Sequence, residues 1–389
     1  MPEVALLPYL TYPTLVLMSP LTYLLTGNTW AFVFIAFGII PTVDAILPVD
    51  TVNPTKEEQS KMAKKKSYRH MVYIAAIVEI AVWLWGLHVF ATAELNVYQR
   101  VGFILSHGIF GAAGFNVAHE LFHKISNKFE VILGNINMIP MLYLHFYVEH
   151  VWGHHKNVAT PGDPASSRRN ETLYAFLPRT LVGGFKSAWN LEAERLKKEK
   201  KSVYSLENRH FTFFLVYIVA LTATYHFYGT LGLTYYLLVA LNSVIYLETI
   251  NYVEHYALTR KEIKPGVYEP VDIRHSWNCT QSFSNWILFR LQRHSDHHEN
   301  ALKPYQNLCS YEDSPTLPQG YPLCIIMSLY PKVWFEMAHG VLKKYHELGK
   351  TPAKIPMKVR SVVNKTIFWS FSVSFAVTAG CSAYNAYAQ

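Results

Sequence analysis

Charged residues are scarce in this sequence and are missing from long stretches of it. Only 16% of the 389 residues are Asp, Glu, Lys or Arg, whereas 51% are hydrophobic. An ordinary soluble protein has about a quarter charged residues. Between the charged stretches run apolar segments of about 18 to 22 residues, the length that crosses the hydrocarbon core of a bilayer as a helix. The composition therefore predicts an integral membrane protein.

Cysteine is also scarce. The four cysteines, Cys279, Cys309, Cys324 and Cys381, lie far apart and form no C-x-x-C pair, which excludes a disulfide framework and a rubredoxin-type iron site. The start of the chain has neither a basic leader nor a small-residue cleavage site, so no cleaved signal peptide is expected. Internal repeats and low-complexity linkers are missing as well.

Six apolar segments are predicted to cross the membrane as helices: residues 5–25, 30–47, 71–92, 101–118, 211–228 and 233–252. The first two contain prolines, so kinks or an early end are expected there. The predicted fold class is therefore an all-α integral membrane protein, a bundle of about six transmembrane helices.

The basic residues predict the orientation, because Lys and Arg in short loops stay on the cytoplasmic side. They gather in residues 56–69 and 195–209, whereas the turns near Asn28, Glu94 and Gly229 are almost uncharged. Six crossings then place both termini in the cytoplasm, at the inner membrane if the source is bacterial. This topology explains the formal charge of +8, and no basic groove with interleaved aromatics predicts nucleic-acid binding.

Histidine is abundant, and half of the eighteen histidines fall into three boxes and one isolated motif. The box HELFH places two imidazoles at i and i+4 on one helical face. HVWGHH repeats this pair and adds a third imidazole about 100° round the helix. The third box is HSDHH, and the isolated motif NYVEH ends the sixth apolar segment. The nine residues are His119, His123, His150, His154, His155, His255, His294, His297 and His298.

The predicted topology puts all nine histidines on one side of the membrane, in a histidine-rich cytoplasmic cap. Nine imidazoles exceed what one metal can hold, but they suit two metals with a position left open on at least one. Imidazole binds zinc, copper, iron and nickel alike, so the spacing does not choose the metal. In isolation, HELFH is also typical of a zincin with Glu120 as general base, but a zincin leaves six histidines unexplained. The other histidines are expected to pack, to lie at the membrane interface or to support the ligands, and a direct role stays an alternative for His107 and His145.

Longer stretches surround the boxes: NVAHELFHK (116–124), EHVWGHH (149–155), VATPGDPASSR (158–168), NYVEHY (251–256), RHSWN (274–278) and LQRHSDHH (291–298), with PTVD (41–44) and NP (53–54) before them. The boxes resemble those of the membrane-bound desaturase and hydroxylase superfamily, and these stretches resemble the alkane 1-monooxygenases. The resemblance extends from about residue 30 to about residue 350. One departure is Ala257, which stands where the family usually has glycine.

The resemblance implies O2-dependent terminal hydroxylation of an n-alkane to a primary alcohol at two non-haem irons, with the nine histidines as ligands. It also implies electrons from a rubredoxin on a separate chain, reduced by an NAD(P)H-dependent reductase. The nearest alternative is a fatty-acyl desaturase or lipid hydroxylase of the same superfamily. A transporter or metal-binding membrane protein is a further alternative, but it predicts ligands near mid-membrane and paired half-repeats.

A bound imidazole generally needs a partner on its other ring nitrogen. The candidate partners are carboxylates near the boxes, each of which is equally typical of ordinary solvated charge: Glu120, Glu149, Asp163, Glu248, Glu254, Asp296 and Glu299. Glu248 and Glu79 are expected to have interior roles, because a carboxylate within a membrane span is costly unless it faces a polar interior.

The hydrocarbon path is expected to be apolar and open to the bilayer, but no substrate-binding residue is predicted. Residues 1–350 are predicted to form the hydroxylase domain, and residues 351–389 a tail. The apolar run at 367–379 in this tail is short for a spanning helix. This run is predicted to form either a helix on the membrane surface or a seventh membrane crossing.

Overall fold

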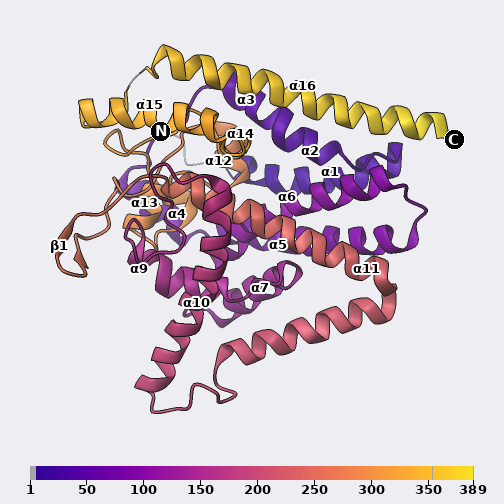
Figure 1. The fold of residues 1–389 in the computed structure, drawn as a ribbon, viewed down its shortest axis with the longest axis horizontal. Helices are drawn as coiled ribbons and strands as arrows, with labels where there is room; N and C mark the ends of the chain where they lie inside the picture. Colours follow the sequence, from indigo (N-terminus) through magenta and orange to yellow (C-terminus); the bar gives the residue numbers. More distant parts are fainter. Residues whose placement is uncertain (1–5, 353, 389) are drawn as a thin grey trace.

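The computed structural model describes residues 6–352 and 354–388, and these residues are mostly helical (Figure 1). Ala5 and Gln389, at the ends of the first predicted span and of the tail, lie outside the described residues. The strands β1 (Glu262–Lys264) and β2 (Val267–Tyr268) pair antiparallel in a short hairpin that projects from one end of the molecule. The described chain is thus a helical bundle, as predicted.

Four described helices are long and apolar enough to cross a membrane. They are α5 (Lys66–Thr92), α6 (Val97–Phe122), α11 (Arg209–His255) and α16 (Met357–Ala388). The chain reverses within α11 at Gly229, whose φ of 61° favours glycine, so α11 holds both the fifth and the sixth predicted segments (Figure 1). The last four predicted spans therefore fall in α5, α6 and the two halves of α11.

The first two predicted spans are helical but shorter. The turn η1 (Leu7–Leu10) leads into α1 (Thr11–Thr26), which contains Pro20. The second span consists of α2 (Ala31–Phe34), the π-helical turn η2 (Ile35–Ile39) and α3 (Ile40–Ile46). Because these segments are shorter and interrupted, the count of six crossings stays a prediction.

The tail forms one long helix, α16, that extends well beyond its apolar run at 367–379. It packs along α2 and α3, where the Ser370 hydroxyl donates to the Phe37 carbonyl and Asn28 Nδ2 donates to Ser382 Oγ at 2.7 Å. It begins beside α15 (Pro331–Leu348) and ends at the far end of the bundle, whereas η1 begins at the near end (Figure 1). This course favours the seventh crossing over a surface helix, and such a crossing would separate the two termini that the six-span topology placed together.

A helix that the sequence did not predict, α7 (Lys128–Met138), runs back along α6 and ends in the turn η3 (Ile139–Met141). Asn137 Nδ2 donates to the Gly114 carbonyl at 3.0 Å. The Tyr236 hydroxyl donates to the Ile139 carbonyl at 2.7 Å, and the Tyr217 hydroxyl accepts from the Leu144 amide at 2.6 Å. Irregular backbone at this depth is tolerated because its polar groups are satisfied by protein. The segment returns the chain to α8 (Phe146–Val148) and the second histidine box.

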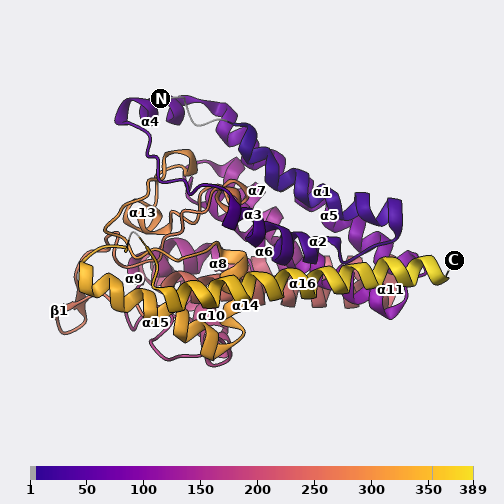
Figure 2. The same ribbon diagram turned by 90° about the horizontal axis from the view of Figure 1, so that it is seen from above.

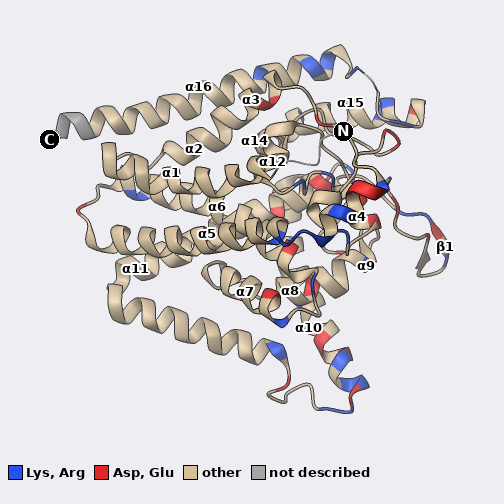
Figure 3. Ribbon diagram, turned by 180° about the vertical axis from the view of Figure 1, so that it is seen from behind, with Lys and Arg blue, Asp and Glu red and all other residues tan. Residues whose placement is uncertain are grey.

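Charged side chains gather at one end of the bundle and are sparse at the other (Figure 3). The charged end carries α4 (Lys56–Lys64), the hairpin, and the end of α10 (Leu173–Lys198). The two basic loops thus lie at the same end, in agreement with the predicted topology. Which membrane face this end occupies stays a prediction.

Short elements close the charged end of the bundle (Figure 2). They are the π-helical turn η4 (Glu149–His154), α9 (His155–Asn157), α12 (Ser282–Ile287), α13 (His294–Glu299), η5 (Tyr305–Asn307) and α14 (Tyr321–Ser328). The histidine boxes lie in η4, α9 and α13 and at the adjacent ends of α6 and α11.

Candidate metal centre

The structure brings all nine predicted histidines together in two groups, and in each group the possible ligand nitrogens lie within 4.8 Å of one another. The five-histidine group consists of His119, His123, His150, His155 and His297. The four-histidine group consists of His154, His255, His294 and His298. Residues that are spread from 119 to 298 in the sequence therefore share one buried site.

Two elements contribute to both groups. The second box gives His150 and His155 to the five-histidine group and His154 to the four-histidine group. Conversely, α13 gives His297 to the five-histidine group and His294 and His298 to the four-histidine group. The helix ends are more specialised, since α6 serves only the first group and α11 only the second. The two groups are therefore built on a shared backbone.

The pairing inside the second box differs from the prediction. The i, i+4 spacing placed His150 and His154 on one face, but they belong to different groups. The backbone at 149–154 is π-helical, and its wider turn brings residues five apart onto one face. His150 Nε2 consequently lies 3.0 Å from His155 Nε2.

The spacing of the nitrogens suits metal ions. His119 Nε2 lies 2.9 Å from His297 Nε2 and 3.0 Å from His123 Nε2, and His294 Nε2 lies 3.0 Å from His298 Nε2. One ring proton cannot satisfy three such nitrogens at once. Two nitrogens that bind one ion at about 2.1 Å, at right angles, lie about 3.0 Å apart. The donor sets therefore fit two imidazole-bound metals.

Burial also favours metal binding, because it lowers the pKa of most of these imidazoles and keeps them neutral, the form that binds metal. Outside the long helices this applies to His123, His150, His155, His294, His297 and His298. His154 is the exception. Burial disfavours its charged form, but the Asp163 carboxylate outweighs this and raises the pKa of His154 to about 9.

Two of the predicted carboxylates contact histidine rings. Asp163 Oδ2 lies 3.0 Å from His154 Nδ1 and fixes that ring with Nε2 free for a metal. Glu254 Oε2 lies 3.4 Å from His294 Nε2. Sequence reasoning missed Ser276, whose hydroxyl lies 3.4 Å from His255 Nδ1. Ser276 lies in the RHSWN stretch, but a single hydroxyl has no spacing signal of its own.

Other predicted carboxylates make their recorded hydrogen bonds elsewhere. Glu120 Oε1 accepts from Arg69, which also pairs with Glu130; sequence reasoning missed both partners. This ion pair argues against Glu120 as a zincin-type base. Glu248 accepts from the hydroxyls of Tyr143 and Thr180, at 2.9 and 2.7 Å, and from an amide.

Glu149 is buried, and its Oε1 has no hydrogen-bond partner among the described residues. Burial, with the nearby Asp163 charge, raises the pKa of Glu149 to about 8. Glu79 accepts from the Tyr12 hydroxyl at 3.0 Å in the interior of the bundle, as expected of a carboxylate within a span.

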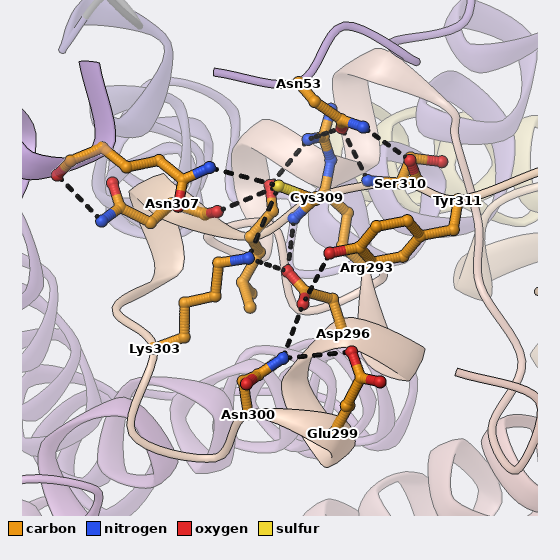
Figure 4. A network of polar contacts seen from close by, with 12 residues as sticks. Asn53, Arg293, Asp296, Glu299, Asn300, Lys303, Asn307, Cys309, Ser310 and Tyr311 are labelled. Atoms are coloured by element: carbon orange, nitrogen blue, oxygen red, sulfur yellow. Dashed lines mark hydrogen bonds and ion pairs between the residues drawn. The ribbon is translucent and has the colours of Figure 1, made fainter. Parts of the chain in front are cut away.

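Asp296 on α13 lies among side chains of the loop that follows this helix, Lys303, Cys309 and Tyr311 (Figure 4). Its Oδ2 accepts from the Cys309 amide at 2.6 Å and from Lys303 Nζ at 2.7 Å, and its Oδ1 accepts from Asn300 at 3.2 Å and from Tyr311 at 3.3 Å. This fully buried carboxylate therefore ties α13 to the loop that follows it. Glu299 is exposed and contacts Asn300.

The remaining histidines lie outside both groups. His107 is buried in α6 between the Tyr235 hydroxyl and Ser19 Oγ. His145 lines a small cavity that also touches His150 and His154. The roles expected for these two histidines stay predictions.

Ala257 follows the ligand-bearing end of α11 with a φ of 59°, and its amide donates to the Ser167 carbonyl at 3.0 Å. This left-handed conformation explains the usual family glycine, because a Cβ there costs roughly 1–2 kcal/mol. Alanine keeps the turn, and α11 still ends at His255.

An apolar cavity lies between α1, α3, α6, α11, α12 and α14. Its lining is almost entirely hydrocarbon, and its few hydroxyls belong to Tyr12, Tyr246, Ser284 and Tyr321. On α11 it is lined by Tyr246 and Ile250, which lie on the face that continues to Glu254. The next turn of that face of α11 carries Glu254, the neighbour of His255.

Comparison with known proteins finds similarity over most of the chain. The fatty acid desaturase family profile matches residues 96–325. Alkane 1-monooxygenase 1 of Pseudomonas aeruginosa is 38% identical over 348 residues, covering 87% of this chain and 91% of that protein. Alkane 1-monooxygenase 1 of Alcanivorax borkumensis is 34% identical over 336 residues, covering 83% of each. The xylene/toluene monooxygenase hydroxylase component XylM of Pseudomonas putida is 25% identical over 358 residues, covering 88% of this chain and 90% of that protein.

Proposed function

The chain belongs to the alkane 1-monooxygenases within the fatty acid desaturase family, and on that premise we propose that it hydroxylates the terminal carbon of an n-alkane, with O2, at two histidine-bound irons. The observation that carries the proposal is the convergence of nine histidines into groups of five and four. The product is a primary alcohol, and the nine histidines are the proposed ligands.

An unactivated C–H bond cannot be attacked by an acid, a base or a nucleophile. Bound iron would supply the activation of O2 that this reaction requires. The protein's part is to hold the irons and to orient the imidazoles that bind them. Asp163 fixes the His154 ring, and the buried position of α13 keeps water from its three imidazoles.

The apolar cavity suits the proposed substrate. An alkane partitions from water into such a lining through the hydrophobic effect. The cavity lies among helices that contact the bilayer, and the next turn of its α11 face carries Glu254. We infer that the alkane lies in this cavity with its reacting end toward Glu254.

The electron donor is proposed to be a rubredoxin, reduced by an NAD(P)H-dependent reductase. The four cysteines of the chain are buried, and they form neither a disulfide nor a C-x-x-C pair, which supports a donor on a separate chain. Rubredoxins are acidic, and the basic loops lie at the end of the bundle that holds the histidines (Figure 3). Opposite charges on the two proteins would speed their encounter. That end is proposed to face the cytoplasm.

A fatty-acyl desaturase or lipid hydroxylase is the second candidate, favoured by the family profile that matches residues 96–325. One assay distinguishes the two functions. Iron-loaded protein with rubredoxin, reductase and NADH is given octane or an acyl substrate, and we expect 1-octanol from octane and no product from the acyl substrate. Desaturated acyl product with untouched octane would support the alternative.

Metal content checks the same proposal without turnover. We expect about two irons per chain in the purified protein, and His294→Ala, which removes one nitrogen of the four-histidine group, should lower this number. An exchange of the exposed Glu299 for alanine is the matched control in the same helix and should leave the iron content unchanged. A single zinc per chain would contradict the di-iron proposal.

A further inference from the structure

A buried carboxyl group, Glu254, lies beside the cavity-lining residue Tyr321. Ile250 lines the cavity on α11, and Glu254 lies one turn farther along the same helical face, about 6 Å closer to the end of the helix. Glu254 Oε2 approaches His294 Nε2, but Glu254 Oε1 is buried without a hydrogen-bond partner among the described residues. An unused acceptor therefore lies between the cavity and the four-histidine group.

Tyr321 provides an unused donor at the same place. It is the first residue of α14, its amide donates to Gln292 Oε1 at 2.8 Å, and its side chain lines the cavity while only 1% exposed. Its hydroxyl is buried and faces the Glu254 carboxyl, but the two groups do not form a hydrogen bond of ordinary geometry. The adjacent Glu254 charge, after burial, raises the pKa of Tyr321, so the hydroxyl keeps its proton.

Two other cavity hydroxyls, those of Tyr12 and Ser284, already have hydrogen-bond partners. The Tyr12 hydroxyl donates to Glu79 at 3.0 Å, and Ser284 Oγ accepts from Gln292 Nε2 at 2.8 Å. A buried polar group without a partner costs about 1–3 kcal/mol, and here a donor and an acceptor stand side by side in that condition. A ligand with one oxygen that both accepts and donates satisfies the two groups together.

We propose that the Tyr321 hydroxyl and Glu254 Oε1 form a subsite for the hydroxyl of a primary alcohol. The alcohol oxygen accepts from Tyr321 and donates its own proton to Glu254, while the alkyl chain fills the apolar cavity. An alkane fills the same cavity but satisfies neither group. This subsite deepens the proposed function and rests on it for the identity of the alcohol as the product. It makes the enzyme bind 1-octanol more tightly than octane.

The test compares Tyr321→Phe with Tyr246→Phe, which removes a hydroxyl two helical turns from Glu254 in the same cavity. Binding of 1-octanol and of octane is measured on metal-free protein in lipid nanodiscs, and inhibition of octane turnover by 1-octanol is measured on iron-loaded protein. We expect Tyr321→Phe to weaken 1-octanol in both measurements by about 3- to 10-fold, the effect of one lost hydrogen bond, with octane affinity within about two-fold. Tyr246→Phe should bind 1-octanol and octane as tightly as the unchanged protein does.

Unchanged affinity for 1-octanol in Tyr321→Phe would overturn the proposal, and so would an equal loss in Tyr246→Phe. Equal weakening of octane and 1-octanol would also overturn it, because a lost packing contact affects both. The binding measurement separates this proposal from the proposed function. If the unchanged protein binds 1-octanol through Tyr321 but produces no octanol from octane, the function fails and the subsite remains.

Discussion

The five-histidine group and the four-histidine group use the same two shared elements but have different surroundings. Recorded carboxylate and hydroxyl contacts fall on the four-histidine group, where Asp163, Glu254 and Ser276 each approach a ring. The rings of the five-histidine group have no such contact among the described residues; Glu120 is held by Arg69 instead. The two groups therefore differ in their surroundings, because only the four-histidine group has recorded carboxylate and hydroxyl neighbours.

Adjacent residues in α13 test whether the groups are separable. His297 belongs to the five-histidine group and His298 to the four-histidine group. Because each change removes a proposed ligand, we expect His297→Ala and His298→Ala each to reduce octane turnover by more than about 100-fold. This loss exceeds the effect of removing a residue that only hydrogen-bonds to a ligand. Iron titration should show one weakened site in each variant. If either change empties both sites, the groups act as one unit.

Asp163→Asn sharpens the comparison, because it removes a carboxylate that only the four-histidine group has. The amide keeps the shape but loses the charge that supports His154. We expect metal affinity at one site to fall about 10- to 100-fold while the other site is unchanged. Metal titration followed by cobalt absorption measures both sites. The matched control is Asp272→Asn, which changes a carboxylate paired with His275 outside both groups.

Of these changes, we expect Asp296→Asn to have the smallest effect on metal affinity and to affect the two groups equally. Asp296 ties α13 to the following loop through Lys303 and the Cys309 amide (Figure 4), and α13 serves both groups. The amide retains an acceptor but leaves the Lys303 charge unpaired, a loss of about 1–3 kcal/mol. Thermal unfolding should shift to lower temperature, with both metal affinities reduced by a similar factor. A loss confined to one site would show that α13 does not couple the groups.

Much of the site could be predicted from the sequence, because ligand histidines occur at short helical spacings that the chain itself displays. All nine predicted histidines lie in the two groups. Their division between the groups could not be predicted, because a π-helical turn in the second box exchanges the i, i+4 pair of His150 and His154 for the pair of His150 and His155. A local change of helical pitch leaves no mark in the spacing.

The partners of the ligands were less predictable. Asp163 and Glu254 contact rings, but Asp296, which lies between two of the histidines in sequence, makes its recorded hydrogen bonds to the loop that follows α13. Neighbours on a helix face different directions, so proximity in sequence is a poor guide to contact. Arg69 and Tyr321 come from distant segments and had no motif to reveal them.

The sequence by itself determined that this chain is a helical membrane protein with a nine-histidine site, since apolar length and histidine spacing are properties of short segments. Only the tertiary structure decided how the histidines divide, that α7 folds back along α6, and that α16 runs the length of the bundle. The reason is physical: these features depend on packing between segments up to several hundred residues apart, as in the contact of Asn28 with Ser382. Such packing fixes geometry that no single segment encodes.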